Sequence, residues 1–108
     1  MRTRLVDMRD YAVKAIDLLG NLSPEAFASD DRTFYAVIKC VEVVGEAAAQ
    51  IGRSDLQSLS SDIPWRDVIG MRNILVHEYS GISPETIFDT VTLDFPVLIQ
   101  ALEKLLET

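Results

Sequence analysis

Residues 34–52, FYAVIKCVEVVGEAAAQIG, contain a long apolar stripe. Its apolar side chains recur at steps of three and four residues, which is the spacing of one face of an α-helix. Asp30 or Asp31 can cap the start of this helix, and Gly52 suits its end. The spacing therefore predicts a long helix at the core of the fold. The stripe consists of Phe34, Val37, Ile38, Val41, Val44, Ala48 and Ile51.

The flanking segments also show helical patterns. An amphipathic first helix is expected to end near Gly20, and a short helix can start at residues 23–25, Ser-Pro-Glu, where serine is a favourable N-cap and proline a favourable first residue. Residues 53–62 are polar and predict a connection, with room for a short helix around Leu56 and Leu59. The apolar positions of the first helix and its end are Leu5, Met8, Ala12, Ala15, Leu19 and Leu22.

Two further helical regions are expected after this connection. One opens at residues 62–65, Asp-Ile-Pro-Trp, runs to about Glu78 and ends at Gly81. The other starts at residues 83–85, Ser-Pro-Glu, and continues to the C-terminus. Pro96 lies inside it, so we expect a kink or a break near Asp94.

These elements predict an all-α fold. Four main helices joined by short connections favour an antiparallel four-helix up-and-down bundle with extra short helices, in a single domain spanning residues 1–108. The helix of residues 34–51 carries more apolar residues than one stripe needs. A small bundle commonly buries such a surplus between two copies, so a homodimer is expected.

Composition limits the possible functions. The net charge of −7 argues against non-specific coating of nucleic acid, which needs a basic surface. No apolar run approaches the length of a membrane span, and the charged start of the chain does not resemble a signal peptide. The single cysteine, Cys40, cannot form an internal disulfide and is expected in the core. These features predict a protein of the reducing cytoplasm.

The segment from Arg72 to Tyr79 combines groups that suit acid–base chemistry. His77 is the only histidine among 108 residues. An imidazole can exchange a proton near neutral pH, and the guanidinium of Arg72 can stabilise charge on a phosphate. Asn73 lies four residues before His77 and therefore shares its helix face. On spacing alone, the simpler explanation is a histidine that merely ends a helix, with Arg72 five residues earlier by chance. One histidine and one cysteine make a poor ligand set for zinc, so no metal site is expected.

Residues 63–79, IPWRDVIGMRNILVHEY, resemble the signature region of the HepT toxins in the HEPN superfamily. The superfamily's arginine, polar residue and histidine match Arg72, Asn73 and His77. The tyrosine found two residues beyond the histidine in HepT proteins matches Tyr79. Residues 44–48, VGEAA, are similar to the family's Gly-Glu-Ala segment, which places Glu46 on a facing helix.

The resemblance implies a homodimeric, metal-independent endoribonuclease without a cofactor, with tRNA as a leading candidate substrate. In this interpretation His77 acts as general base or acid, Arg72 stabilises the phosphate and Asn73 positions the scissile group. Glu46 either orients Arg72 or His77, or has a solvated or capping role. The family toxin is paired with an MntA-type minimal nucleotidyltransferase antitoxin, and Tyr79 would accept AMP from it.

Two other interpretations stay open on the sequence alone. The dimer could be a non-catalytic partner of a nucleotidyltransferase that holds a nucleotide or RNA near Arg72 and His77 without cutting it. It could also be a purely structural helical dimer, which would explain the apolar stripe but not the motif.

Overall fold

The computed structural model describes residues 2–52, 55, 58, 63, 65–70 and 82–107. Every regular element in these residues is helical, which confirms the predicted all-α class. The four-helix up-and-down bundle and the homodimer remain predictions. Leu56, Leu59 and the motif residues 72–79 lie outside the described residues.

Helix α1 spans Arg2–Leu19 and buries the apolar face predicted for it. Leu5, Met8, Ala12, Ala15 and Leu19 are all buried. The helix ends where Gly20 adopts a φ of +57°, a conformation that glycine tolerates without strain. The guanidinium of Arg2 donates a hydrogen bond to the carbonyl oxygen of Leu106 at 3.2 Å, so the two ends of the chain lie together.

Helices α2, Pro24–Ser29, and α3, Asp31–Ile51, begin at the predicted caps. The Ser23 hydroxyl accepts the N–H of Ala26 at 3.1 Å. The Asp30 carboxylate accepts the Thr33 N–H at 3.1 Å and its hydroxyl at 2.9 Å, and these bonds lower the pKa of Asp30. Each cap satisfies helix N–H groups that have no partner within the helix.

Helix α3 supplies much of the core, as predicted. It ends at Gly52, which has a φ of +94°. Cys40 is also buried, and burial raises the pKa of its thiol. The stripe residues Phe34 and Ile51 are partly buried against the core. The fully packed part of α3 comprises Val37, Ile38, Cys40, Val41, Val44, Gly45, Ala47 and Ala48.

The α-helical hydrogen-bonding pattern of the last region is interrupted near Asp94, where Pro96 predicted a kink or a break. Helix α6, Pro84–Asp89, continues into a π-helical segment η2, Thr90–Asp94, and then into α7, Phe95–Leu106. Proline lacks an N–H, and its ring crowds the carbonyl four residues earlier. The wider π-turn accommodates this crowding, because the Phe95 N–H donates to the Thr90 carbonyl five residues back. Thr92 donates its hydroxyl to the Phe88 carbonyl at 2.8 Å.

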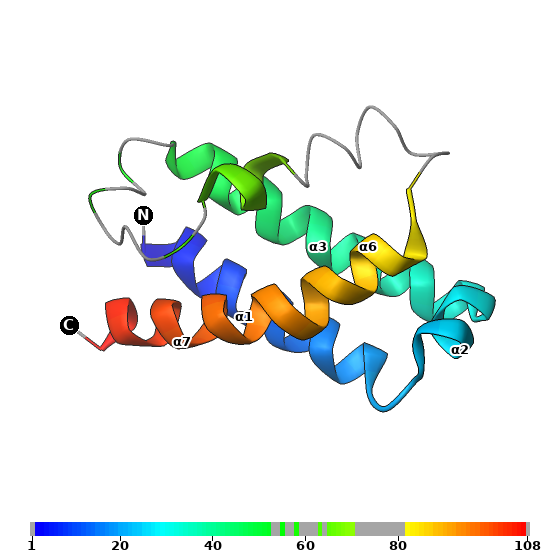
Figure 1. The fold of residues 1–108 in the computed structure, drawn as a ribbon. Coiled ribbons are helices and arrows are strands. Elements are labelled where there is room, and N and C mark those ends of the chain that lie inside the picture. The colour runs from blue at the N-terminus through cyan, green and yellow to red at the C-terminus, as the bar shows by residue number, and fades with distance from the viewer. Residues whose placement is uncertain are drawn as a thin grey trace.

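The helices pack around α1 (Figure 1). Helix α3 runs back along α1, and α7 packs against α1 as well, while α2 contacts both α3 and α6 at one end of the molecule. Residues 65–70 are also helical, and Trp65 and Ile63 are buried in the same core. In the part of the chain that the structure describes, none of the helices has the length and apolar character needed to cross a bilayer.

Candidate functional site

The four motif residues Arg72, Asn73, His77 and Tyr79 fall outside the described residues, so their geometry stays a prediction. The helical segment of residues 65–70 leads directly into the motif. Trp65 at its start has no exposed surface, and its backbone N–H donates to the Ile63 carbonyl at 2.8 Å. Because this indole is enclosed by the core, the start of the helical segment of residues 65–70 is held in place.

Glu46 lies on α3 and is half-buried. Its carboxylate accepts a hydrogen bond from the side-chain amide of Gln50 at 3.1 Å. It also lines a charged groove between α1 and α3, together with Arg4, Asp7 and Lys39. The structure therefore places Glu46 on a polar edge of the α1–α3 pair. Its orienting role toward Arg72 or His77 stays a prediction.

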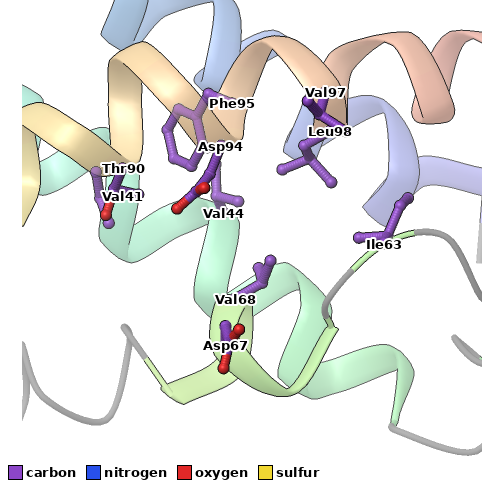
Figure 2. A pocket seen from close by; sticks show the side chains of 10 residues that line it. All are labelled: Val41, Val44, Ile63, Asp67, Val68, Thr90, Asp94, Phe95, Val97 and Leu98. Carbon is purple, nitrogen blue, oxygen red and sulfur yellow. The ribbon is translucent and has the colours of Figure 1, made fainter.

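A second groove lies between α3, residues 63–68 and the η2–α7 junction (Figure 2). Its cavity has a volume of about 170 Å³. An apolar cavity of about 150 Å³ is large enough to hold a benzene ring, so this one has room for a single large apolar side chain. The apolar lining consists of Val41, Val44, Ile63, Val68, Phe95, Val97 and Leu98.

The polar lining of this groove is acidic. Asp67 and Asp94 approach it from different helices, and Thr90 completes the lining (Figure 2). An adjoining hollow shares these three residues and adds Asp89 and Arg66. Partial burial raises the pKa of the Asp94 carboxyl, and repulsion from Asp67 and Asp89 raises it further. The three carboxylates therefore form one electrostatic cluster beside an apolar cavity.

The described residues contain no group of histidine, cysteine and carboxylate side chains arranged to hold a metal ion. Thr90, the buried polar residue of the groove, donates its hydroxyl to the Thr86 carbonyl at 2.9 Å. The Thr90 hydroxyl therefore donates its hydrogen bond to the backbone of the irregular helix.

A family model described as "Ribonuclease HepT-like" matches residues 8–105. The chain belongs to the HepT-like ribonuclease family. The match includes the whole Arg72–Tyr79 segment and every residue of the groove beside η2. The predicted family resemblance is thereby confirmed.

Named relatives agree with this membership. A protein named "Probable ribonuclease HepT" from Thermococcus cleftensis is 35% identical over 103 residues, which cover 92% of this chain and 93% of that protein. A protein named "Putative RNase" from Methanocaldococcus jannaschii is 31% identical over 103 residues, which cover 95% of this chain and 84% of that protein. No solved structure gives a significant match.

Sequence reasoning missed the acidic groove of this HepT-like chain. Asp67 and Asp94 are 27 positions apart and no local pattern links them. They line the same groove because Trp65 fixes one helix against the core while the π-turn of η2 sets the direction of the other. The threonines before Pro96 were the available sign of an irregular helix, because threonine hydroxyls readily bond to backbone carbonyls within a helix.

Proposed function

We propose that this chain is the toxin of a type VII HepT/MntA toxin–antitoxin system and cuts RNA as a metal-independent endoribonuclease in the cytoplasm. Family membership carries the proposal. The family match spans the segment in which Arg72 precedes His77 by five positions. The name of the Thermococcus cleftensis relative supports ribonuclease activity as well.

The residue types of the motif suit this reaction. Cleavage without a metal needs a base for the 2′-hydroxyl proton, an acid for the departing 5′-oxygen and positive charge beside the phosphorane. His77 would act as base or acid, Arg72 would stabilise the phosphate, and Asn73 would position the scissile group. One chain supplies one histidine, so a homodimer that joins two motifs would provide the second acid–base group.

Glu46 is proposed to support the motif from α3. Its half-buried position limits its freedom, and its bond to Gln50 shows that the carboxylate already accepts hydrogen bonds. A carboxylate can fix the orientation of a guanidinium through paired hydrogen bonds. The effect of Glu46 on cleavage would then be indirect and smaller than that of Arg72 or His77.

The partner antitoxin would be an MntA-like minimal nucleotidyltransferase that modifies Tyr79. The tyrosine oxygen would attack the α-phosphate of ATP, form a phosphodiester to AMP and release pyrophosphate. The tyrosine proton would pass to solvent. The added anion, two residues from His77, would repel the RNA backbone and block access to the motif.

Cleavage of tRNA tests the catalytic roles. His77→Ala is expected to lower the single-turnover cleavage rate by roughly 10²- to 10⁴-fold, the usual range for an acid–base group. Arg72→Ala removes charge stabilisation at the phosphorane and should lower the rate by roughly 10²- to 10³-fold. The helical circular dichroism signal should not change. Glu103→Gln, an exposed substitution on α7, is the matched control. Full activity of His77→Ala would rule out the catalytic role of this residue. Tight RNA or nucleotide binding by wild-type protein that never cuts would favour the non-catalytic alternative.

Metal independence has its own measurement. Cleavage is expected to continue at the same rate when EDTA is added in excess over trace divalent ions. A loss of activity that Mg²⁺ or Mn²⁺ restores would contradict the proposal for the reaction chemistry, while leaving the family membership intact.

Intact-mass spectrometry after incubation with the cognate transferase and ATP tests the modification. The protein should gain the mass of AMP, and Tyr79→Phe should gain nothing. Tyr35→Phe removes an exposed tyrosine of α3 and should still be modified. Modification that persists in Tyr79→Phe would place the acceptor elsewhere.

A further inference from the structure

The groove beside η2 has an apolar entrance as well as an apolar interior. Leu93 is 65% exposed and Val97 is 55% exposed, and they lie four residues apart along the η2–α7 junction. Val97 also lines the cavity, and Leu93 lines the adjoining hollow. Water is therefore in contact with an apolar surface that leads into an apolar cavity.

The same entrance is strongly acidic. Asp67, Asp89 and Asp94 line the two adjoining hollows, and Arg66 is the basic residue among the described lining residues. Partial burial raises the pKa of Asp94, and repulsion from Asp67 and Asp89 adds to the effect. A cation placed over these carboxylates would relieve that repulsion. Apolar surface that leads to a negative cluster suits a ligand with an apolar group next to a positive charge.

We propose that this groove binds a short segment of a protein partner that carries one large apolar side chain and a lysine or arginine about one helical turn away. The apolar side chain would enter the cavity of about 170 Å³, which holds one leucine-, methionine- or phenylalanine-sized group. The cation would lie over Asp89 and Asp94 in the adjoining hollow. The two subsites share Asp67, Thr90 and Asp94, so the anchor and the cation would lie close together.

Charge decides between this occupant and two others. A second copy related by a two-fold axis through the groove would bring the three carboxylates against their own copies. An RNA backbone would bring phosphates to the same carboxylates. Both arrangements are electrostatically unfavourable, whereas a basic, apolar segment is complementary.

The proposal does not depend on ribonuclease activity. The described residues of the groove precede and follow the motif in sequence, and a peptide bound there would need no cleavage chemistry. Failure of the test below would leave the proposed function standing, and an inactive enzyme could still bind the segment.

Selection from a random peptide library displayed on phage tests the proposal with the full chain as bait. The enriched peptides should share a large apolar residue with a lysine or arginine three or four positions away. A synthetic peptide with the enriched sequence is then measured by fluorescence anisotropy. Replacing its cation by glutamate or its apolar residue by alanine should weaken binding by at least about tenfold.

Protein variants locate the binding site. The double variants Leu93→Ala/Val97→Ala and Asp89→Asn/Asp94→Asn should each weaken binding of the synthetic peptide by about tenfold. Leu18→Ala and Asp17→Asn change exposed residues of the same types on α1, and they should leave the affinity unchanged. Because all these residues are exposed, the variants are expected to fold normally.

Three results would overturn the proposal. The first is an enriched set without basic residues, or no enrichment. The second is equal binding of the synthetic peptide to the groove variants and to wild-type protein. The third is a different occupant: light scattering that shows Leu93→Ala/Val97→Ala converting an oligomer to a monomer would assign the groove to a second copy. Loss of tRNA binding in the same variant would assign it to RNA.

Discussion

Two contacts of α3 differ in how completely they are packed. On one side α3 packs against α1, whose core residues Met8, Ala12 and Ala15 have no exposed surface. At the groove beside η2, Val41 and Val44 of the same helix border a cavity of about 170 Å³. Side chains without exposed surface occupy the first contact, whereas the second borders unfilled apolar space.

This difference in packing predicts that the first contact determines the stability of the fold and that the second provides a binding surface. Packed apolar contacts stabilise the fold, while an unfilled apolar cavity beside exposed Leu93 and Val97 contributes little to folding. The groove also concentrates carboxylates whose repulsion opposes folding. We therefore expect substitutions of the fully buried α1 residues to change the free energy of unfolding, and substitutions of the exposed Leu93 and Val97 to change binding.

Truncating one side chain in each region should give the largest difference in the free energy of unfolding. Met8→Ala should lower the free energy of unfolding by about 2–5 kcal/mol, because it removes buried contacts and leaves a cavity. Leu93→Ala should change it by less than about 0.5 kcal/mol, because that side chain is mostly exposed. Urea denaturation followed by circular dichroism measures both. Equal losses of unfolding free energy would show that Leu93 at the groove entrance belongs to the stabilising core.

Enlarging one side chain in each region should give a smaller difference in the free energy of unfolding. Ala12→Leu forces a larger group into a filled interface and should cost about 1–3 kcal/mol. Val44→Phe directs its added hydrocarbon into the cavity and should cost less, within about 1 kcal/mol of wild type. The measurement is again the urea midpoint. A Val44→Phe protein destabilised as much as Ala12→Leu would mean that the cavity cannot accept a ring, which would also weaken the proposed anchor subsite.

The well-packed region was largely predictable from the sequence. Caps at Ser23, Asp30 and Ser83 and the helix ends at Gly20 and Gly52 depend on short-range chemistry, and all of them were confirmed. The apolar stripes of α1 and α3 were confirmed for the same reason, since a helix face is defined by residues three and four apart.

The groove was not predictable, because its residues meet only through tertiary packing. Pro96 predicted a break near Asp94 but not its form. The π-turn depends on which groups find partners: here the Phe95 N–H donates to the Thr90 carbonyl, and the Thr92 hydroxyl donates to the Phe88 carbonyl. Asp67 then reaches the same place from a separate helix. The motif residues Arg72 and His77 were found by spacing and family resemblance, and both lie outside the described residues.

The smallest expected effect is an opposite pH dependence at two carboxylates. The pKa of Asp30 is lowered by its capping bonds to Thr33, so its contribution to stability is present above the unfolded pKa and is lost as pH falls through the folded pKa. The pKa of Asp94 is raised by partial burial and by Asp67 and Asp89. Its contribution is greatest below the unfolded pKa and is lost as pH rises through the folded pKa.

Urea midpoints measured from about pH 3 to pH 7 test this contrast, because the window spans the carboxyl titrations. Asp30→Ala should be less stable than wild type near neutral pH, and the difference should shrink at low pH. Asp94→Asn should be slightly more stable near neutral pH, and that difference should also shrink at low pH. Asp17→Asn, on the exposed side of α1, is the control. Destabilisation by Asp94→Asn at neutral pH would mean that this carboxylate is held by a favourable partner, and the groove would then be less available to a cation.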